Sequence, residues 1–350
     1  MRYTITAATA SAALFAGTAQ AEVPQVITDV PPVHSLVAQV MGDLGTPDIL
    51  LDQGGDPHSF QLRPSQAAAL SRADILFWIG PELTPWLDRA VEGVGLRGEA
   101  IALLHAEGVH RQDYGDDHGH DHGDHGHGHD DHGHDEDHDH SAGHDHDHAD
   151  DHGHDHARDD HGHSHHGHDH EHHDHSHDGL DPHAWLDPAN ARVWLDLIAA
   201  ELAGHDPENA DIYLANAEAA KARVDAAEAE VQSVLSPVGD APIYVFHDAY
   251  GYFAGHFGLN IAGTVALGDA ATPGAARLSG LRDDIAGGSG VCIFPEAQHS
   301  DAQITQLAAS DEIRLGGALD PEGTTLDYGP GLYEALLLSL ATTIADCVTE

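Results

Sequence analysis

The sequence predicts an α/β protein in which two βα lobes with mainly parallel sheets are joined by one long rigid helix. Two observations predict this fold. Short apolar segments alternate with helical patterns in both halves of the chain, as is typical of parallel βαβ units. Between the halves, small and apolar side chains recur at threes and fours over about 30 residues, which indicates one long helix. A helix this long in a chain of otherwise short elements is expected to link two domains.

The amino terminus has the pattern of a secretory signal peptide. Arg2 precedes an apolar run from Ile5 to Gly17, and Ala19 and Ala21 supply small residues at the expected cleavage positions. The run is shorter than the ~20 residues that a spanning helix needs, and we expect no later segment to be long and apolar enough to cross a bilayer. Residues 1–21 are thus a predicted signal peptide, cleaved after about Ala21, and the mature protein is predicted to be exported.

The N-terminal lobe is assigned to residues 22–205. Its predicted strands are residues 26–28, 48–51 and 75–79, and its predicted helices are residues 33–41, a segment starting near Pro64, 83–91 and 191–202. Asp206 and Pro207 then predict the N-cap and first position of the linking helix, assigned to residues 206–236. Its expected buried positions are Tyr213, Ala217, Ala220, Val224, Ala227, Val231 and Leu235. A coiled-coil dimer helix is the alternative interpretation of this pattern.

The C-terminal lobe is assigned to residues 237–350. Its predicted strands are residues 243–246, 261–265 and 291–294, and its predicted helices are residues 250–257, 278–285, 302–309 and 331–346.

Residues 115–178 form a compositionally distinct insert within the N-terminal lobe. They hold 26 of the 35 histidines and 21 acidic residues, and no Leu, Ile, Val, Phe, Trp, Tyr or Met. Such a segment cannot bury enough apolar surface to order itself, so we predict disorder. Neutral imidazoles bind zinc, copper and nickel, and the spacing of His118, His120, His122 and His125 lets neighbouring rings share one ion. The insert is therefore a predicted auxiliary, low-affinity metal collector; a solvated tether is the alternative.

The formal charge of −47 is not confined to the insert, because 39 acidic and 12 basic residues remain outside it. Such a surface repels nucleic acid and anionic lipid and attracts cations. No nucleic-acid partner is expected, and a monomer is the default prediction. The two cysteines, Cys292 and Cys347, suit an oxidising compartment whether paired or free, and their number and spacing exclude a CxxC redox or thiolate zinc site.

Three histidines outside the insert are the candidate metal ligands. His58 and His247 follow predicted strands, and His183 lies in a loop that is stiffened by prolines on both sides. Three convergent imidazoles suit tetrahedral Zn²⁺, with water or a carboxylate in the fourth position. Asp320 is the candidate for that carboxylate, and Glu296 is expected to accept an imidazole N–H. The alternative is three unrelated histidines with local hydrogen-bond partners.

Five segments carry a resemblance to a known family: GGDPHSFQLRPS at 54–65, DPHAWLDP at 181–188, YVFHDAYGYF at 244–253, CIFPEAQ at 292–298 and LDP at 319–321. Together they resemble the zinc-specific periplasmic solute-binding proteins of bacterial ABC zinc importers, the high-affinity zinc uptake receptor family. The resemblance implies two α/β lobes with metal in the cleft between them, an acidic His-rich loop, His58, His183 and His247 as ligands, and a Cys292–Cys347 disulfide.

The resemblance also implies the function: a receptor, not an enzyme, captures Zn²⁺ as its transported ligand and delivers it to a membrane permease. A periplasmic zinc chaperone is a further candidate partner. Some zinc-binding members carry an acid directly before the first ligand, where this chain has Pro57, and this departure favours water or Asp320 as the fourth ligand. Manganese and iron relatives replace the third histidine by a carboxylate, so His247 favours zinc.

Three other functions stay open at this point. The chain could be a manganese- or iron-binding homologue of the same fold, or a metal storage or chaperone protein that acts through the insert alone. It could also be a zinc hydrolase or lyase, for which Glu296 is the one general base that we can name. Imidazole ligation predicts that zinc affinity weakens as the pH falls toward ~6.5 and below.

Overall fold

The computed structural model describes residues 23–114, 179–266, 273–287, 292–310 and 313–350 of the chain, and all of them belong to one compact unit. The predicted signal peptide and the His-rich insert, with His118, His120, His122 and His125, lie outside the described residues.

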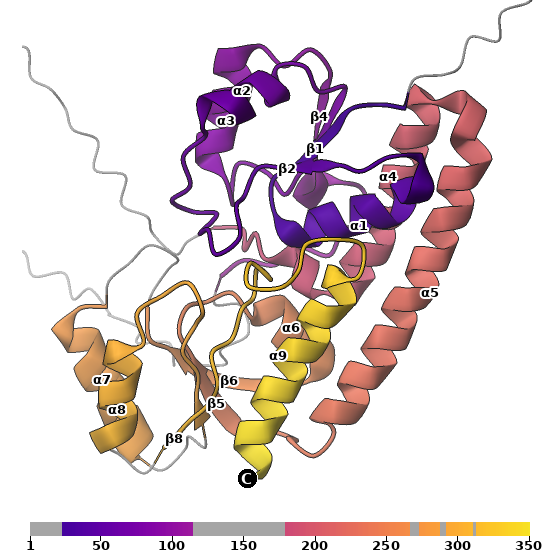
Figure 1. Ribbon diagram of the computed structural model, residues 1–350. Helices are drawn as coiled ribbons and strands as arrows, with labels where there is room; N and C mark the ends of the chain where they lie inside the picture. Colours follow the sequence, from indigo (N-terminus) through magenta and orange to yellow (C-terminus); the bar gives the residue numbers. More distant parts are fainter. Residues whose placement is uncertain (1–22, 115–178, 267–272, 288–291, 311–312) are drawn as a thin grey trace, which may run out of the picture. The chain divides into compact units, whose positions relative to one another are not determined.

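The first sheet contains four parallel strands in the order β2-β1-β3-β4 (Figure 1): β1 (Val26–Thr28), β2 (Asp48–Ile49), β3 (Ile75–Trp78) and β4 (Glu99–Ala102). Its helices are α1 (Pro31–Met41), α2 (Pro64–Leu70) and α3 (Pro85–Val94). Helix α1 starts with two prolines, which suit the first turn, and ten of its 11 residues are buried, as its nearly continuous apolar sequence favours. The sequence did not predict β4, because its first two residues are exposed and it lacks a continuous apolar run.

The second sheet repeats this topology in the order β6-β5-β7-β8, again with parallel pairs: β5 (Pro242–Val245), β6 (Asn260–Thr264), β7 (Cys292–Ile293) and β8 (Arg314–Leu315). Its helices are α6 (Gly251–Phe257), α7 (Ala275–Ala286) and α8 (Ala302–Ser310). Strand β5 lies between β6 and β7, so the chain passes from β5 to its neighbour β6 on one side and then crosses to β7 on the other side. The carboxyl ends of β5 and β7 therefore form the edge at which open α/β sheets bind ligands.

Three long helices complete the fold: α4 (Pro188–His205), α5 (Ala210–Leu235) and α9 (Leu332–Thr349). Helix α5 packs against α4, α9 and α1, and its buried residues are the seven that the spacing predicts. Its predicted start was wrong, because residues 207–209 form a separate 3-10 turn and the Asp206 side chain caps no backbone N–H. That carboxylate instead accepts hydrogen bonds from Asn209 and from the Tyr213 hydroxyl.

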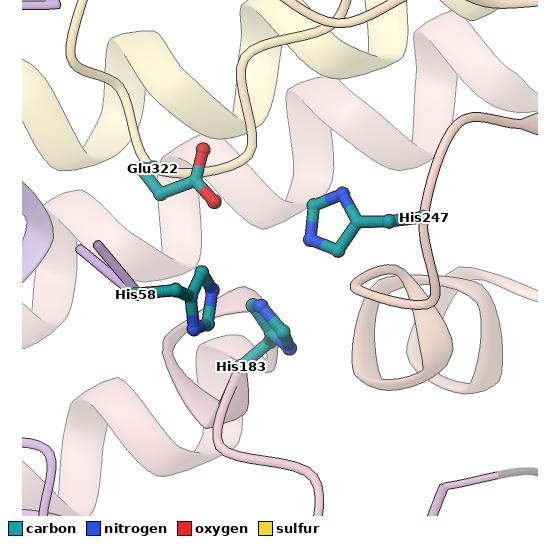
Figure 2. Close-up of side chains that lie close together, drawn as sticks. All are labelled: His58, His183, His247 and Glu322. Atoms are coloured by element: carbon teal, nitrogen blue, oxygen red, sulfur yellow. The ribbon is translucent and has the colours of Figure 1, made fainter. Parts of the chain in front are cut away.

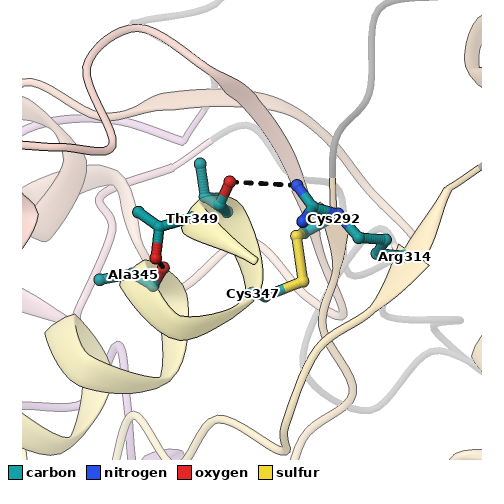
Figure 3. Close-up of a disulfide and its surroundings, with 6 residues drawn as sticks. Cys292, Arg314, Ala345, Cys347 and Thr349 are labelled. Atoms are coloured by element: carbon teal, nitrogen blue, oxygen red, sulfur yellow. Dashed lines mark hydrogen bonds between the residues drawn. A yellow bond between two sulfur atoms is a disulfide. The ribbon is translucent and has the colours of Figure 1, made fainter.

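Helix α9 is, within the described residues, the one helix whose length and composition would allow it to cross a membrane, so the expectation that no later segment qualifies was wrong. Its apolar face is buried in the protein core, where it packs against α5 and α1. Cys347 near its carboxyl end forms a disulfide with Cys292 of β7 (Figure 3), which confirms the pairing that the resemblance implies. Arg314 of β8 also donates to the Val348 carbonyl, 3.1 Å away, so α9 is fixed to the second sheet.

Candidate metal site

His58 lies in the loop that follows β2, and hydrogen bonds hold the residues on both sides of it. The Asp56 carboxylate accepts from the His58 N–H at 2.8 Å and from the Ser59 hydroxyl at 2.7 Å. The Trp86 indole N–H donates to the Pro57 carbonyl at 2.7 Å. These contacts explain how a loop rich in Gly and Pro can hold one imidazole in a fixed place.

His183 is fully buried and is held by the acid two residues before it. The Asp181 carboxylate lies 2.7 Å from His183 Nδ1 and also accepts from the His183 backbone N–H at 3.0 Å. Trp185 is buried and donates to the Pro321 carbonyl at 2.8 Å. The His183 segment is thus joined to the loop that carries Asp320.

His247 follows β5, and Glu296 follows the neighbouring strand β7, so the two side chains meet at the edge of the second sheet. Glu296 Oε2 lies 2.6 Å from His247 Nδ1. The Tyr250 hydroxyl donates to the other Glu296 oxygen at 2.8 Å, and burial raises the pKa of Tyr250 well above its ordinary value. A phenol that stays protonated keeps donating to Glu296, and Glu296 keeps its orientation toward His247.

The three imidazoles converge on one point, although they come from distant parts of the chain (Figure 2). The ring centroids of His183 and His247 are 5.3 Å apart, and those of His58 and His183 are 5.8 Å apart. The Nε2 atoms of all three rings are buried. Because the carboxylates of Asp181 and Glu296 accept hydrogen bonds from the Nδ1–H groups of His183 and His247, the Nε2 atoms of these two rings carry the lone pair and are directed to the shared space.

Glu322 completes this group and was missed by the sequence analysis. One ligand atom from each of His58, His183, His247 and Glu322 lies within 4.8 Å of the other three (Figure 2). Glu322 is 4% exposed, and burial raises the pKa of its carboxyl to about 8, against the attraction of His247. A buried carboxyl with a raised pKa is a group that a cation would convert to its charged form.

Asp320, the fourth ligand proposed from the sequence, is not part of this group. One of its carboxylate oxygens accepts from the backbone N–H of Thr324 at 3.1 Å, and the other accepts from that of Thr325 at 2.8 Å. Gln298 donates to the same side chain at 2.6 Å. Asp320 therefore shapes the turn that carries Glu322, two residues further on. The one signal for Glu322 in the sequence is a second acid in the same loop.

A second group of possible ligands, His247, Glu296 and His299, overlaps with the first. His299 Nε2 lies 3.7 Å from Glu296 Oε2, and the His299 ring stacks on Phe246 at 4.5 Å. Glu296 already accepts from His247 and Tyr250, so His299 extends the hydrogen-bonded surroundings of His247 and does not form a separate site.

Comparison with known proteins places the chain in a family. The family described as "Zinc-uptake complex component A periplasmic" (ZnuA) matches residues 26–347. The high-affinity zinc uptake system protein ZnuA of Paracoccus denitrificans is 52% identical over 330 residues, which cover 94% of this chain and 93% of that protein. The corresponding protein of Brucella suis is 37% identical over 325 residues, covering 93% and 92% of the two chains.

Solved structures share the fold at lower identity. A crystal structure of ZnuA is 22% identical with a TM-score of 0.65, covering 93% of this chain and 99% of that chain. A zinc-bound ZnuA deletion mutant is 23% identical with a TM-score of 0.65 and covers 93% and 98% of the two chains. A Mn²⁺ complex of the solute-binding protein FpvC from Pseudomonas aeruginosa is 18% identical with a TM-score of 0.67, covering 93% and 99%. These similarities confirm the predicted fold class.

Proposed function

Because this chain belongs to the ZnuA family of periplasmic zinc-uptake components, we propose that it captures Zn²⁺ and delivers it to the membrane permease of an ABC importer. The observation that carries this proposal is the convergence of three imidazoles and one carboxylate on a single point. The two sheets would belong to the predicted lobes 22–205 and 237–350, with residues 206–236 linking them and the ion between them.

The chemistry of the four side chains fits zinc. Zn²⁺ takes nitrogen at ~2.0–2.1 Å and carboxylate oxygen at ~2.0–2.2 Å in a tetrahedral shell, which separates neighbouring ligand atoms by about 3.4 Å. The four ligand atoms lie within 4.8 Å of one another, which is close enough for one ion to contact all of them. Three nitrogens and one oxygen favour zinc over manganese, which prefers oxygen ligands, although a manganese-bound protein shares the fold. The donor set therefore does not favour the manganese-binding alternative.

The surrounding charges also suit a divalent cation. Asp181, Glu296 and Glu322 are all buried, at 2%, 3% and 4% exposed. A buried ionised carboxylate is costly unless a cation or a hydrogen-bond donor compensates for it, and a bound Zn²⁺ would supply two positive charges among these three side chains. Glu296 serves as a hydrogen-bond acceptor for His247 in this arrangement, so the hydrolase or lyase alternative loses the one general base that the sequence named for it.

The His-rich insert is proposed to collect zinc for this site with low affinity. Its two ends support this role, because the Tyr114 N–H donates to the Gly179 carbonyl at 3.0 Å and the Tyr114 ring lies 6.4 Å from that of His183. The insert therefore leaves and rejoins the described chain beside a proposed ligand. We further propose signal cleavage after about Ala21, a monomeric periplasmic protein, and a periplasmic zinc chaperone as a possible additional partner.

The test is a zinc titration of a protein in which residues 115–178 are replaced by Asn-Gly. Tyr114 and Gly179 are already hydrogen-bonded neighbours on antiparallel segments, so a two-residue turn can join them. We expect one tight zinc equivalent, which His58→Ala removes. His105→Ala is the matched control, because His105 is exposed and pairs with Glu82, outside the group. Unchanged tight binding in the His58→Ala protein would refute the assignment, and loss of tight binding on deleting the insert would favour the storage alternative.

A further inference from the structure

Gln112 connects the proposed zinc ligands to a segment that the sequence analysis did not single out. Its side-chain amide donates to Asp181 Oδ2 at 3.0 Å, while Asp181 Oδ1 lies 2.7 Å from His183 Nδ1. The two oxygens of one buried carboxylate are thus divided between Gln112 and the proposed ligand. A side chain that fixes one oxygen fixes the direction of the other.

The backbone of Gln112 is held as firmly as its side chain. Its carbonyl accepts from the Asp181 N–H at 2.9 Å, and its own N–H donates to the Tyr252 hydroxyl at 3.1 Å. That hydroxyl donates in turn to the Asp181 carbonyl at 3.0 Å, which closes a ring of hydrogen bonds between Gln112, Asp181 and Tyr252. Tyr252 belongs to α6, the helix that begins four residues after His247.

The start of α6 also packs against the Gln112 amide. A Cβ atom at Gly251 would overlap with Gln112 Nε2 and would lie 3.4 Å from Asp181 Oδ2. Glycine at this position therefore leaves room for the Gln112–Asp181 hydrogen bond. The overlap concerns the far end of a flexible side chain, so a methyl group there would displace the amide and leave the backbone in place.

We propose that Gln112 is a positioning residue for zinc binding, whose amide holds Asp181 in the orientation that aims His183 Nε2 at the ion. This inference rests on the proposed zinc site and adds a residue to its support. Without the amide, Asp181 keeps only the hydrogen bonds of its Oδ1 to the backbone N–H and Nδ1 of His183, so the carboxylate and the His183 ring are held less firmly. Groups that orient a ligand in this way typically change metal affinity by ~10–100-fold when they are removed. Because Gln112 acts through Asp181, we expect the lower end, roughly tenfold.

The experiment compares the mature full-length protein with Gln112→Ala, Gly251→Ala and the double variant. One zinc equivalent is added, and a competing chelator measures the dissociation constant of the tightest site. Each single variant should weaken zinc binding roughly tenfold. The double variant should bind like Gln112→Ala alone, because the added methyl group has no amide left to displace. This non-additivity is the result that a general loss of stability would not give.

Two further measurements separate positioning from folding. Gln39→Ala is the matched control, because the Gln39 amide also donates to a carboxylate, that of Glu334 at 3.3 Å, between α1 and α9. It should leave the zinc dissociation constant unchanged. NMR of ¹⁵N-labelled histidines should show the His183 Nδ1–H signal shifted or exchange-broadened in Gln112→Ala, with the His247 signal in place. Should Gln112→Ala fail to fold in a thermal scan, Gly251→Ala carries the test.

His183→Ala in the same titration keeps the two proposals distinguishable. Wild-type zinc affinity in both Gln112→Ala and Gly251→Ala, together with a loss in His183→Ala, would overturn the role of Gln112 and leave the zinc site standing. Losses that multiply in the double variant would also overturn it. Wild-type affinity in His183→Ala would overturn the zinc site itself.

Discussion

The choice of Glu322 over Asp320 as the fourth ligand leads to a measurable proton count. A carboxyl with a pKa of about 8 is about nine-tenths protonated at pH 7, and zinc binds the deprotonated form. Zinc binding at pH 7 should therefore release about 0.9 proton from Glu322. Since the folded-state pKa is raised, the contribution of Glu322 to zinc affinity is largest above pH 8 and falls up to about tenfold per pH unit below it.

The substitution Glu322→Gln keeps the shape of the side chain and removes the carboxyl group that can release a proton. Calorimetric zinc titrations in buffers of different ionisation enthalpy, on the insert-deleted protein, should show about 0.9 fewer protons released at pH 7 and about 0.1 fewer at pH 9. The zinc dissociation constant should rise by at least about tenfold. Asp320→Asn is the control and should retain the wild-type proton count. Equal proton release from wild type and Glu322→Gln at pH 7 would show that Glu322 is not the titrating ligand.

Two predictions concern stability. Replacing Cys292 and Cys347 by alanine removes a cross-link between residues 55 positions apart and should lower the free energy of unfolding by about 4 kcal/mol. Urea unfolding without reductant measures this difference, and an unchanged free energy of unfolding would contradict a stabilising disulfide. His256 is hydrogen-bonded to Asp187 at 2.9 Å and to Glu228 at 2.8 Å, and these contacts raise the pKa of His256. The stabilisation from these contacts is therefore complete below pH 6.5, the ordinary pKa of histidine. It is lost as the pH rises through the pKa of His256 in the folded state. His256→Ala should therefore cost about 1 kcal/mol more at pH 6 than at pH 9 in urea unfolding, and a larger cost at pH 9 would refute this sign.

The sequence predicted best where one physical requirement controlled the pattern. The buried positions of α5 repeat at helical spacing, because a helix between other helices must bury one face along its whole length, and all seven were predicted. Strand β8, with two residues, escaped prediction because it is too short to show any period, and its partly exposed Arg314 and exposed Leu315 break the apolar run. Its position depends on pairing with β7, which no local pattern contains.

The same distinction applies to the candidate site. His58, His183 and His247 could be chosen from the sequence because each follows a strand or lies in a proline-fixed loop. The choice between Asp320 and Glu322 could not be made there, because both acids lie in one turn. Gly323, with φ at +69°, lets the chain turn so that backbone N–H groups capture Asp320, while Glu322 is buried beside the histidines. This outcome depends on hydrogen bonds that only the folded turn provides.

A large number of histidines is therefore a poor guide to the selective site. The insert holds 26 of them, yet it has no large apolar residues, so it has nothing with which to offset the cost of burying a carboxylate beside an imidazole. His183 and His247 each have such a carboxylate, and both pairs lie within the part of the chain that has a hydrophobic core. Burial strengthens these hydrogen bonds and prevents the rings from rotating, and a fixed ring is what discriminates between metals. We therefore expect metal selectivity to depend on Asp181 and Glu296 more than on any histidine of the insert. In a binding competition between Zn²⁺ and Mn²⁺, Glu296→Ala should reduce the preference for zinc. Deletion of residues 115–178 should leave that preference unchanged.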